Sequence, residues 1–164
     1  GRPGALTNEA EANIVVSLLK DLTTRSKFFA HVATLNESEP PIGVIAMYAE
    51  QRDLIRRKLD QAEWAGVVRH LFTVGTVDSY QGKENRIIIV SVVRNDTSPK
   101  IGFLKDSERI NVALSRAKDR LFIVSSTHMW AGRAGSPMNK VLREFMEMTQ
   151  EGCAAVHSSK NFLG

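Results

Sequence analysis

A polar segment just before a strongly apolar run holds several groups that can contact a nucleotide. Gly82 permits a positive φ or a close approach of the backbone to a ligand, and successive N–H groups beside it can form an anion-binding concavity. Gln81 can donate or accept hydrogen bonds, and Glu84 can accept them from a hydroxyl, a ribose or a metal-bound water. A plain glycine turn with solvated side chains accounts for these residues equally well. The segment 79–84 alone therefore leaves a functional and a structural interpretation open.

Arginines elsewhere in the chain supply the positive charge that a phosphate group requires. Arg109 and Arg116 are seven residues apart in a predicted helix over 106–118, so both are expected near one face of that helix. Arg52 begins another predicted helix just after a strand, and it can point back toward the rim where the strand ends. Arginine is always charged, and its rigid donor fork suits phosphate. For any single arginine a solvated helix face is the commoner explanation, but the position of Arg52 favours a functional one.

The sequence lacks the groups that would bind a nucleotide unaided. It contains no G-x-x-x-x-G-K-[ST] motif, and the closest candidate, AGRAGSPMNK over 131–140, is interpreted as a loop because it has no Gly-Lys-Ser/Thr at the turn. No pair of acidic strand ends suits magnesium, and no nucleophile–base constellation is present. The single cysteine, Cys153, and the four scattered histidines offer no metal-ligand spacing. We therefore expect no metal site in this chain, and nucleotide-contacting groups without a primary cradle.

The elements that must position these residues alternate between strand and helix. Asn8 is expected to cap the first helix, with Glu11 three residues later as its capping-box partner. Amphipathic periodicity predicts further helices over 50–66, over 106–118 and from Pro137 onward. Near-continuous apolar strands alternating with such helices predict an α/β domain with a largely parallel sheet, covered by helices on both faces. Apolar runs predict the strands themselves over 42–47, 72–77, 86–93 and 120–126.

The link between the second and third predicted strands is unusually short. Residues 78–86 make only nine residues, whereas a crossover between parallel strands usually needs at least ~10–12. We therefore expect a compact connection, such as a single helical turn. Ligands of parallel sheets bind at the carboxyl ends of the strands, and the polar segment 79–84 is expected at such an end.

Composition is that of one ordinary globular domain. The 164 residues, of which 43% are hydrophobic and 24% charged, suffice for a single domain over 1–164 with a real core. No apolar run is long enough to span a bilayer, and the N-terminus lacks a signal-peptide core. The formal charge of +4 is compatible with a nucleic-acid partner. The abrupt start favours a piece excised from a longer, intracellular protein, cytoplasmic or nuclear, with no membrane partner.

Three segments taken together resemble the conserved motifs of superfamily-one helicases. IGVIAMYAEQRDLIRRKL (42–59) resembles motif IV, VGTVDSYQGKENRIIIVSVVR (74–94) resembles motif V, and IGFLKDSERINVALSRAK (101–118) resembles motif VI. TVDSYQGKE and RINVALSRAK look like the branch typified by the nonsense-mediated-decay RNA helicase and its DNA-helicase relatives. The resemblance covers about residues 5–128 in order and spacing, and three motifs in sequence are far more specific than one. No motif covers residues 129–164.

This resemblance implies the second of two RecA-like lobes, with a three-layer fold of the P-loop NTPase type. In such helicases ATP with Mg²⁺ lies between the lobes and is held mainly by the first, N-terminal lobe, which this chain lacks. By similarity, Arg116 is the motif VI arginine that reaches the γ-phosphate, and Arg52 is its motif IV counterpart. Gly82 and Glu84 would contact the nucleotide, and Gln81 beside them would couple it to the nucleic acid.

The resemblance also implies that the parent protein moves along a nucleic acid. Thr76 and Ser79 would contact the backbone of single-stranded DNA or RNA, and Lys118 stands where many relatives have a second arginine. We expect ATP-driven unwinding or translocation by the full-length protein, and no hydrolysis by the fragment alone. A non-catalytic nucleic-acid-binding scaffold with a degenerate helicase fold is the alternative, and an unrelated α/β domain is a third possibility. An upstream G-x-x-x-x-G-K-[ST] in the parent separates the enzyme from the scaffold, and the residues do not choose RNA over DNA.

Overall fold

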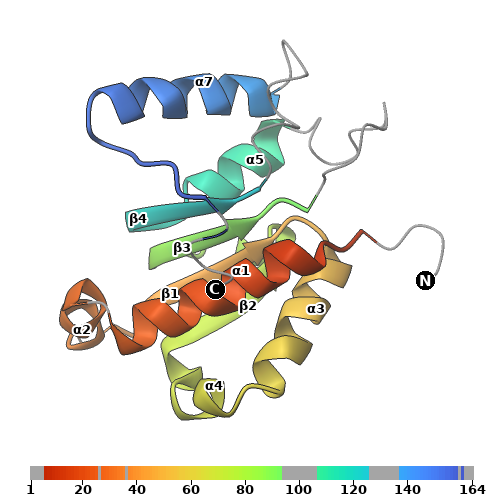
Figure 1. The fold of residues 1–164 in the computed structure, drawn as a ribbon, viewed down its shortest axis with the longest axis vertical. Helices are drawn as coiled ribbons and strands as arrows, with labels where there is room; N and C mark the ends of the chain where they lie inside the picture. Colours follow the sequence, from red (N-terminus) through yellow and green to blue (C-terminus); the bar gives the residue numbers. More distant parts are fainter. Residues whose placement is uncertain are drawn as a thin grey trace.

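One parallel sheet organises the chain (Figure 1). The computed structural model describes residues 6–25, 27–35, 37–93, 107–125, 137–158 and 160. Within these residues the sheet has four strands in the order β2-β1-β3-β4, all parallel. The central strand β1 pairs Val44 with Val74 of β2 and with Ile89 of β3. The strands are β1 (Ile42–Ala46), β2 (Phe72–Thr76), β3 (Asn85–Ser91) and β4 (Ala117–Val124).

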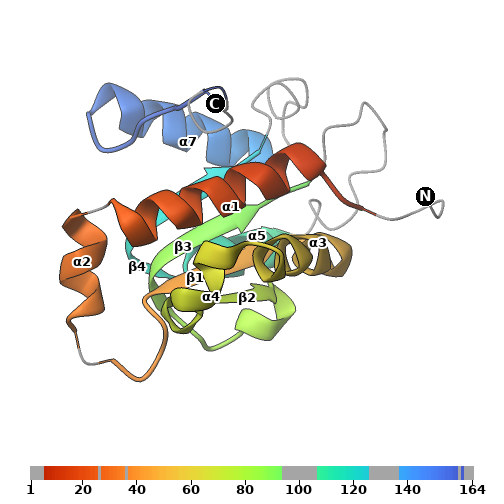
Figure 2. The same ribbon diagram turned by 60° about the horizontal axis from the view of Figure 1, so that its bottom comes forward.

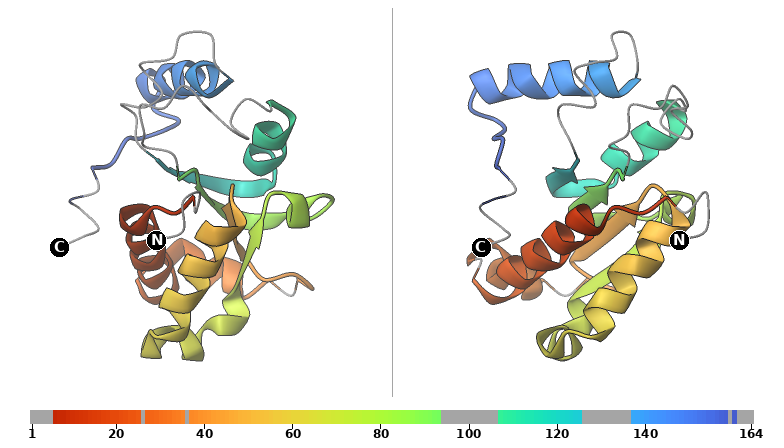
Figure 3. Two further views of the ribbon diagram at one scale, coloured as in Figure 1. Left: turned by 90° about the vertical axis from the view of Figure 1, so that its right-hand side faces the viewer. Right: turned by 45° about the vertical axis from the view of Figure 1, so that its right-hand side comes forward.

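Helices cover both faces of this sheet, as Figures 2 and 3 show. On the first face α1 and α3 pack against one core, and on the second face η2, α5 and α7 pack against another. Side chains of β1 alternate accordingly, since Val44 lies in the first core and Ile45 in the second. The predicted α/β class, with a parallel sheet between helical layers, is confirmed. The helical elements are α1 (Glu9–Thr24), α2 (Lys27–Ala33), α3 (Ala49–Asp60), α4 (Glu63–Val67), η1 (Arg69–Leu71), η2 (Asp78–Tyr80), α5 (Ser107–Leu114) and α7 (Pro137–Gln150).

The boundary between α5 and β4 differs from the prediction. The helix predicted over 106–118 ends at Leu114, and β4 begins at Ala117 rather than at residue 120. The reason is the ladder with β3, in which Asn85 pairs with Ala117 and its N–H donates to the carbonyl of Arg116 at 3.1 Å. Arg116 therefore lies in the turn between α5 and β4, and the expectation that it shares a helix face with Arg109 is wrong.

Other boundaries follow the sequence more closely. The first three strands agree with their predicted ranges to within one or two residues. The single helix predicted over 50–66 is two helices, because the chain leaves helical geometry at Ala62, which adopts an extended conformation before α4. Helix α2 has no counterpart among the predictions. Helix α7 begins at Pro137 as predicted, whereas residues 131–136 of the predicted loop over 131–140 lie outside the described residues.

Two glycines make the short crossover from β2 to β3 possible. The expected single helical turn is present as η2, and it runs over the second face of the sheet. A Cβ atom on Gly43 would lie 2.4 Å from the hydroxyl oxygen of Tyr80, and one on Gly75 would lie 2.5 Å from Oγ of Ser79. The absence of side chains at these two positions lets η2 lie directly on β1 and β2. Nine residues then suffice where a full helix would need more.

Candidate nucleotide and nucleic-acid interface

The predicted nucleic-acid contacts lie where β2 ends. The hydroxyl of Ser79 donates to the carbonyl of Thr76 at 2.8 Å, and it accepts from the N–H of Thr76 at 3.0 Å. Ser79 is exposed and Thr76 is half-buried. The two residues therefore form one closed unit at the carboxyl end of β2. To donate to a phosphate, the Ser79 hydroxyl would have to leave the Thr76 carbonyl.

The predicted nucleotide contacts form a tight turn after η2. The N–H of Lys83 donates to the carbonyl of Tyr80 at 3.1 Å, Gln81 has φ −61° and ψ 120°, and Gly82 has φ +79°. These angles are those of a type II turn, which needs glycine at its third position. The positive φ predicted for Gly82 is confirmed. The N–H of Lys83 is already used within the turn, so it does not contribute to the anion-binding concavity that the sequence suggested.

This turn leads away from the carboxyl ends of the strands. Because β3 is parallel to β2, the chain must return to the opposite edge of the sheet before Asn85, the first residue of β3. Glu84 therefore lies at the amino edge, exposed to solvent. The expectation that all of 79–84 lies at a carboxyl end is wrong for Glu84, because a crossover must span both edges.

Helix α5 lies alongside the crossover and contacts it at both ends. Near the start of α5, Arg109 donates from Nη2 to Oδ2 of Asp78 in η2 at 3.0 Å. Beyond its end, the carbonyl of Arg116 accepts the N–H of Asn85 at 3.1 Å. These contacts place Arg116 beside Glu84, which directly precedes Asn85. The segments that resemble motifs V and VI thus form one continuous surface.

A shallow depression lies between the crossover and the exposed side of α5. Its volume is about 190 Å³, and it is lined by Val77, Asp78, Gln81, Glu108, Arg109 and Val112. Gln81, predicted to couple nucleotide and nucleic acid, is thus at the rim of the only hollow formed jointly by these two segments in the described residues. Ligand pockets that enclose a drug-sized molecule usually measure about 300–1,000 Å³, so this hollow is too small to enclose a nucleotide.

The guanidinium of Arg116 rests on the end of its own helix. Its Nε donates to the carbonyl of Val112 at 3.1 Å, and its Nη2 donates to Oγ of Ser115 at 3.2 Å. Both acceptors are neutral, and the negative end of the α5 dipole adds modest stabilisation. A phosphate oxygen would be a stronger acceptor, because charge-assisted hydrogen bonds are about twice as strong as neutral ones. The geometry therefore leaves Arg116 able to exchange these contacts for a phosphate.

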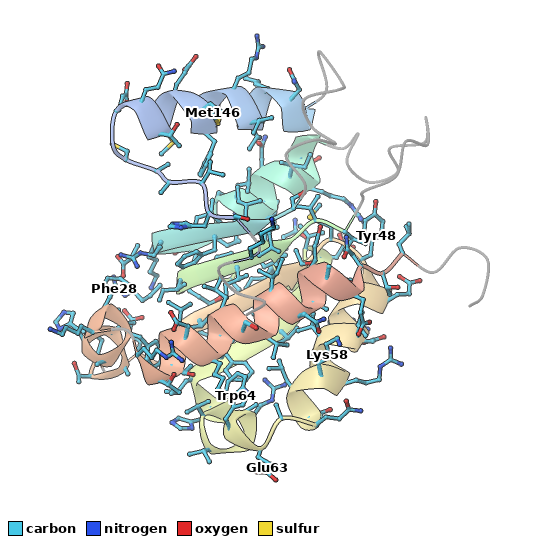
Figure 4. The ribbon with its side chains drawn as sticks, viewed as in Figure 1. Phe28, Tyr48, Lys58, Glu63, Trp64 and Met146 are labelled. Carbon is cyan, nitrogen blue, oxygen red and sulfur yellow. The ribbon has the colours of Figure 1, made fainter. Side chains whose placement is uncertain are left out.

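Arg52 lies at the other edge of the sheet. It is in the first turn of α3, after β1 ends near Tyr48, which Figure 4 labels. Its Nε donates to Oδ1 of Asp53 at 2.8 Å, and this hydrogen bond is the main reason that its pKa is raised. Arg116 precedes the amino end of β4, so the two predicted catalytic arginines are not brought together in the described structure.

Lys118 takes part in a cluster of charges at the amino edge. Its Nζ lies 3.9 Å from Oε1 of Glu37, which also accepts from Nη2 of Arg86 at 2.6 Å. The hydrogen bond from Arg86 is the main cause of the lowered pKa of Glu37. Asp119 lies 3.4 Å from the same arginine. Lys118 thus belongs to β4 and to this cluster, rather than to helix α5.

A buried polar cluster, not predicted as such, joins α1, α3 and β3. The capping prediction is half correct, since Oδ1 of Asn8 accepts the N–H of Glu11 at 3.0 Å. The carboxylate of Glu11 does not return to Asn8. It accepts instead from the hydroxyl of Ser91 at 2.8 Å, while Gln51 supplies the acceptor for the N–H of Asn8 at 2.8 Å. A polar residue on the inner face of each helix was the signal in the sequence, but it did not identify the partners.

Two kinds of feature were sought in the described residues and not found. No group of three or more His, Cys, Asp or Glu side chains there is arranged to hold a metal ion. None of the described helices combines the length and apolar character needed to cross a membrane.

Comparison with known proteins identifies relatives of this chain. A family model described as an AAA domain matches residues 2–128. The chain is 39% identical over 104 residues to "Helicase required for RNAi-mediated heterochromatin assembly 1" of Schizosaccharomyces pombe, which covers 63% of this chain and 10% of that protein. It is 32% identical over 123 residues to "Helicase SEN1" of Saccharomyces cerevisiae, covering 74% of this chain and 5% of that protein. It is 30% identical over 149 residues to "DNA polymerase alpha-associated DNA helicase A" of the same yeast, covering 90% and 19% respectively.

The family match and the described sheet agree with each other. The matched range contains all three helicase-like segments, and the parallel sheet with helices on both faces is the RecA-like arrangement of P-loop NTPase-type domains. The resemblance to superfamily-one helicases is confirmed, and it is consistent with their C-terminal lobe. The chain spans only a small part of each relative. On these observations, the chain belongs to the AAA domain family, in the part of it whose members are named helicases.

Proposed function

We propose that residues 1–164 form the second motor lobe of an ATP-dependent superfamily-one helicase. The observation that carries this proposal is the pairing of the crossover with α5, through Asp78–Arg109 at one end and Asn85–Arg116 at the other. This pairing presents Glu84 and Arg116 side by side. The names of the relatives support a helicase, and the activity of the whole protein is part of the proposal because the chain spans a small part of each relative.

The proposed role of Arg116 is to stabilise the charge that develops at the γ-phosphate of ATP. An arginine supplied to a phosphoryl-transfer site from a second protein surface raises the rate by about 10³–10⁵-fold. Arg116 can take this role because its present acceptors, the Val112 carbonyl and the Ser115 hydroxyl, are neutral and local. Glu84 beside it, together with Gly82, would contact the sugar or phosphates. Arg52 stays a second candidate, and its place at the opposite edge means that it needs a separate test.

The size and chemistry of this surface support a nucleotide shared with another lobe. The depression beside Gln81 is too small to enclose ATP, and the described residues offer no cluster that would hold Mg²⁺. We therefore propose that ATP with Mg²⁺ is held mainly by an N-terminal RecA-like lobe of the same protein. When the two lobes close, Arg116 would meet the phosphate, and hydrolysis would be coupled to that movement.

Single-stranded DNA or RNA is the proposed track of this motor. Thr76 and Ser79 lie at the carboxyl end of β2, and the same crossover continues to Gly82 and Glu84. Movement at the nucleotide would therefore be transmitted to the strand contacts within a few residues. Contacts to phosphates carry no base code, so little sequence preference is expected. We place this activity inside the cell, in the cytoplasm or the nucleus.

The test is strand-stimulated ATP hydrolysis by the parent protein, wild type against Arg116→Ala. We expect kcat to fall by about 10³-fold or more, because the lost arginine acts at the transferred phosphate, while nucleotide binding, measured separately, persists. Arg25→Ala is the matched control, since the side chain of Arg25 is 80% exposed at the end of α1. Unchanged hydrolysis in Arg116→Ala would remove the arginine from the reaction. A wild-type protein that binds nucleic acid without hydrolysing ATP would favour the scaffold alternative.

A further inference from the structure

The carboxylate of Glu11 holds together two segments that are far apart in the sequence. Glu11 is 4% exposed, although it lies in the first turn of α1. Its Oε2 accepts from the hydroxyl of Ser91 and from the N–H of Val93, both at 2.8 Å. Among the described residues its Oε1 is buried without a hydrogen-bond partner. A buried carboxylate that spends one oxygen on the end of β3 and leaves the other unpaired carries a cost that ordinary helix capping does not require.

The backbone that Glu11 holds is itself strained. Val93 has φ +81°, in the left-handed region that β-branched residues rarely adopt. Its side chain is buried at the end of β3, and its N–H is held by Glu11. Conformations of this kind persist only where the surroundings over-determine them, and they concentrate at functional sites.

The same cluster reaches the first turn of α3 through Gln51. Gln51 is fully buried, and its Nε2 donates to Oγ of Ser91 at 3.2 Å and to the carbonyl of Asn8 at 3.0 Å. Its Oε1 accepts the N–H of Asn8 at 2.8 Å. The next residue is Arg52, the motif IV arginine by resemblance. Ser91 is thus shared between Glu11 and Gln51, so the carboxylate and the turn that carries Arg52 are linked by one side chain.

We propose that Glu11 is a positioning residue, which fixes the end of β3 and, through Ser91 and Gln51, the first turn of α3 that presents Arg52. This inference rests on the proposed function of Arg52 in ATP hydrolysis. Burial, which outweighs the hydrogen bonds from Ser91 and from the backbone of Val93 and Val92, raises the pKa of Glu11 to about 7. A group so costly to ionise is consistent with a role beyond capping.

The kinetic test uses the parent protein at pH 7 and four variants. Glu11→Ala removes the acceptor, and we expect kcat for ATP to fall about 10- to 100-fold with little change in KM, since small displacements of a catalytic group cost rates of this size. Glu11→Gln keeps an oxygen for Ser91 and Val93, and it should restore kcat to within about threefold of wild type. Glu11→Asp is one methylene shorter and should behave like Glu11→Ala. Glu9→Ala is the matched control, because Glu9 is a more exposed carboxylate in the same turn that pairs with Lys58 of α3.

A double-mutant cycle shows whether Glu11 acts through Arg52. If it does, Glu11→Ala combined with Arg52→Ala should hydrolyse ATP no more slowly than Arg52→Ala alone, because the second change removes an interaction already lost. Additive losses would overturn the proposal, as would wild-type kcat in a folded Glu11→Ala protein. Failure of Glu11→Gln to restore kcat would overturn it as well.

Hydrogen exchange on the same proteins separates this inference from the proposed function. In Glu11→Ala, peptides covering 88–93 and 48–54 should exchange faster than in wild type, whereas Glu9→Ala should leave both unchanged. Unchanged exchange in Glu11→Ala would overturn the positioning role, whatever the enzyme does. Absence of ATP hydrolysis in the wild-type parent would overturn the proposed function and the catalytic part of this inference together, while faster exchange would still assign the fixed geometry to Glu11.

Discussion

At the scale of the residue, Glu11 makes the stability of the fold depend on pH. Its pKa is about 7 in the folded protein against an ordinary 4.5. The folded state therefore holds the proton more tightly, and the stabilisation is complete below pH 4.5 and is lost as pH rises through 7. A shift of this size corresponds to roughly 3 kcal/mol. Because glutamine does not ionise, the free energy of unfolding of Glu11→Gln relative to wild type should rise by about that amount between pH 4.5 and 8. Urea unfolding of both proteins across this range measures the difference, and parallel pH curves would contradict the prediction.

Arg52 is the second residue whose role a single change can test. In the parent protein Arg52→Ala should lower kcat for ATP by at least about tenfold if the guanidinium reaches a phosphate. Loss of its surface pair with Asp53 alone would change the free energy of unfolding by at most about 1 kcal/mol. Arg57→Ala is the control, since Arg57 is an exposed arginine on the same helix. Equal rates in the two variants would show that the place of Arg52, at the edge opposite Arg116, keeps it out of the reaction.

At the scale of the element, the crossover between β2 and β3 depends on the missing side chain of Gly43. An alanine there would place its Cβ 2.4 Å from the Tyr80 hydroxyl oxygen and 2.4 Å from Oδ1 of Asn85. Both neighbours are buried, so η2 would have to move away from the sheet. We expect Gly43→Ala to destabilise the fold by about 1–3 kcal/mol, the usual cost of overpacking. Gly66→Ala is the control, because its added Cβ would meet no atom within 4 Å. Thermal unfolding of both variants decides, and equal midpoints would mean that η2 is not held against β1.

The elements also show how far pattern alone reaches. Strands β1 to β3 could be predicted because a run such as Ile87–Val90 is itself the signal for a buried strand. The end of α5 could not, because helical spacing continues to Ala117 while the ladder with Asn85 takes that residue into β4. Local periodicity contains no information about a partner strand.

The candidate site divides along the same line. Residue type and motif order singled out Arg116, Gly82 and Glu84, and the positive φ of Gly82 followed from its being glycine. The partners of Glu11 could not be predicted, since Ser91 and Val93 are 80 and 82 residues further along the chain. Contacts of that separation are set by the packing of α1 across the sheet rather than by any local signal.

At the scale of the whole molecule, the chain presents half of a catalytic site. The surface formed by the crossover and α5 offers an arginine and a carboxylate, but its depression of about 190 Å³ is too small to enclose a nucleotide. Purified residues 1–164, checked for folding by circular dichroism, should therefore show no strand-stimulated ATP hydrolysis above background. Arg116→Ala should change nothing in this fragment, although it abolishes hydrolysis in the parent protein. Turnover by the fragment that Arg116→Ala removes would mean that this lobe binds and hydrolyses ATP without a partner, because an arginine that acts only across a closed cleft has no phosphate to meet in the isolated lobe.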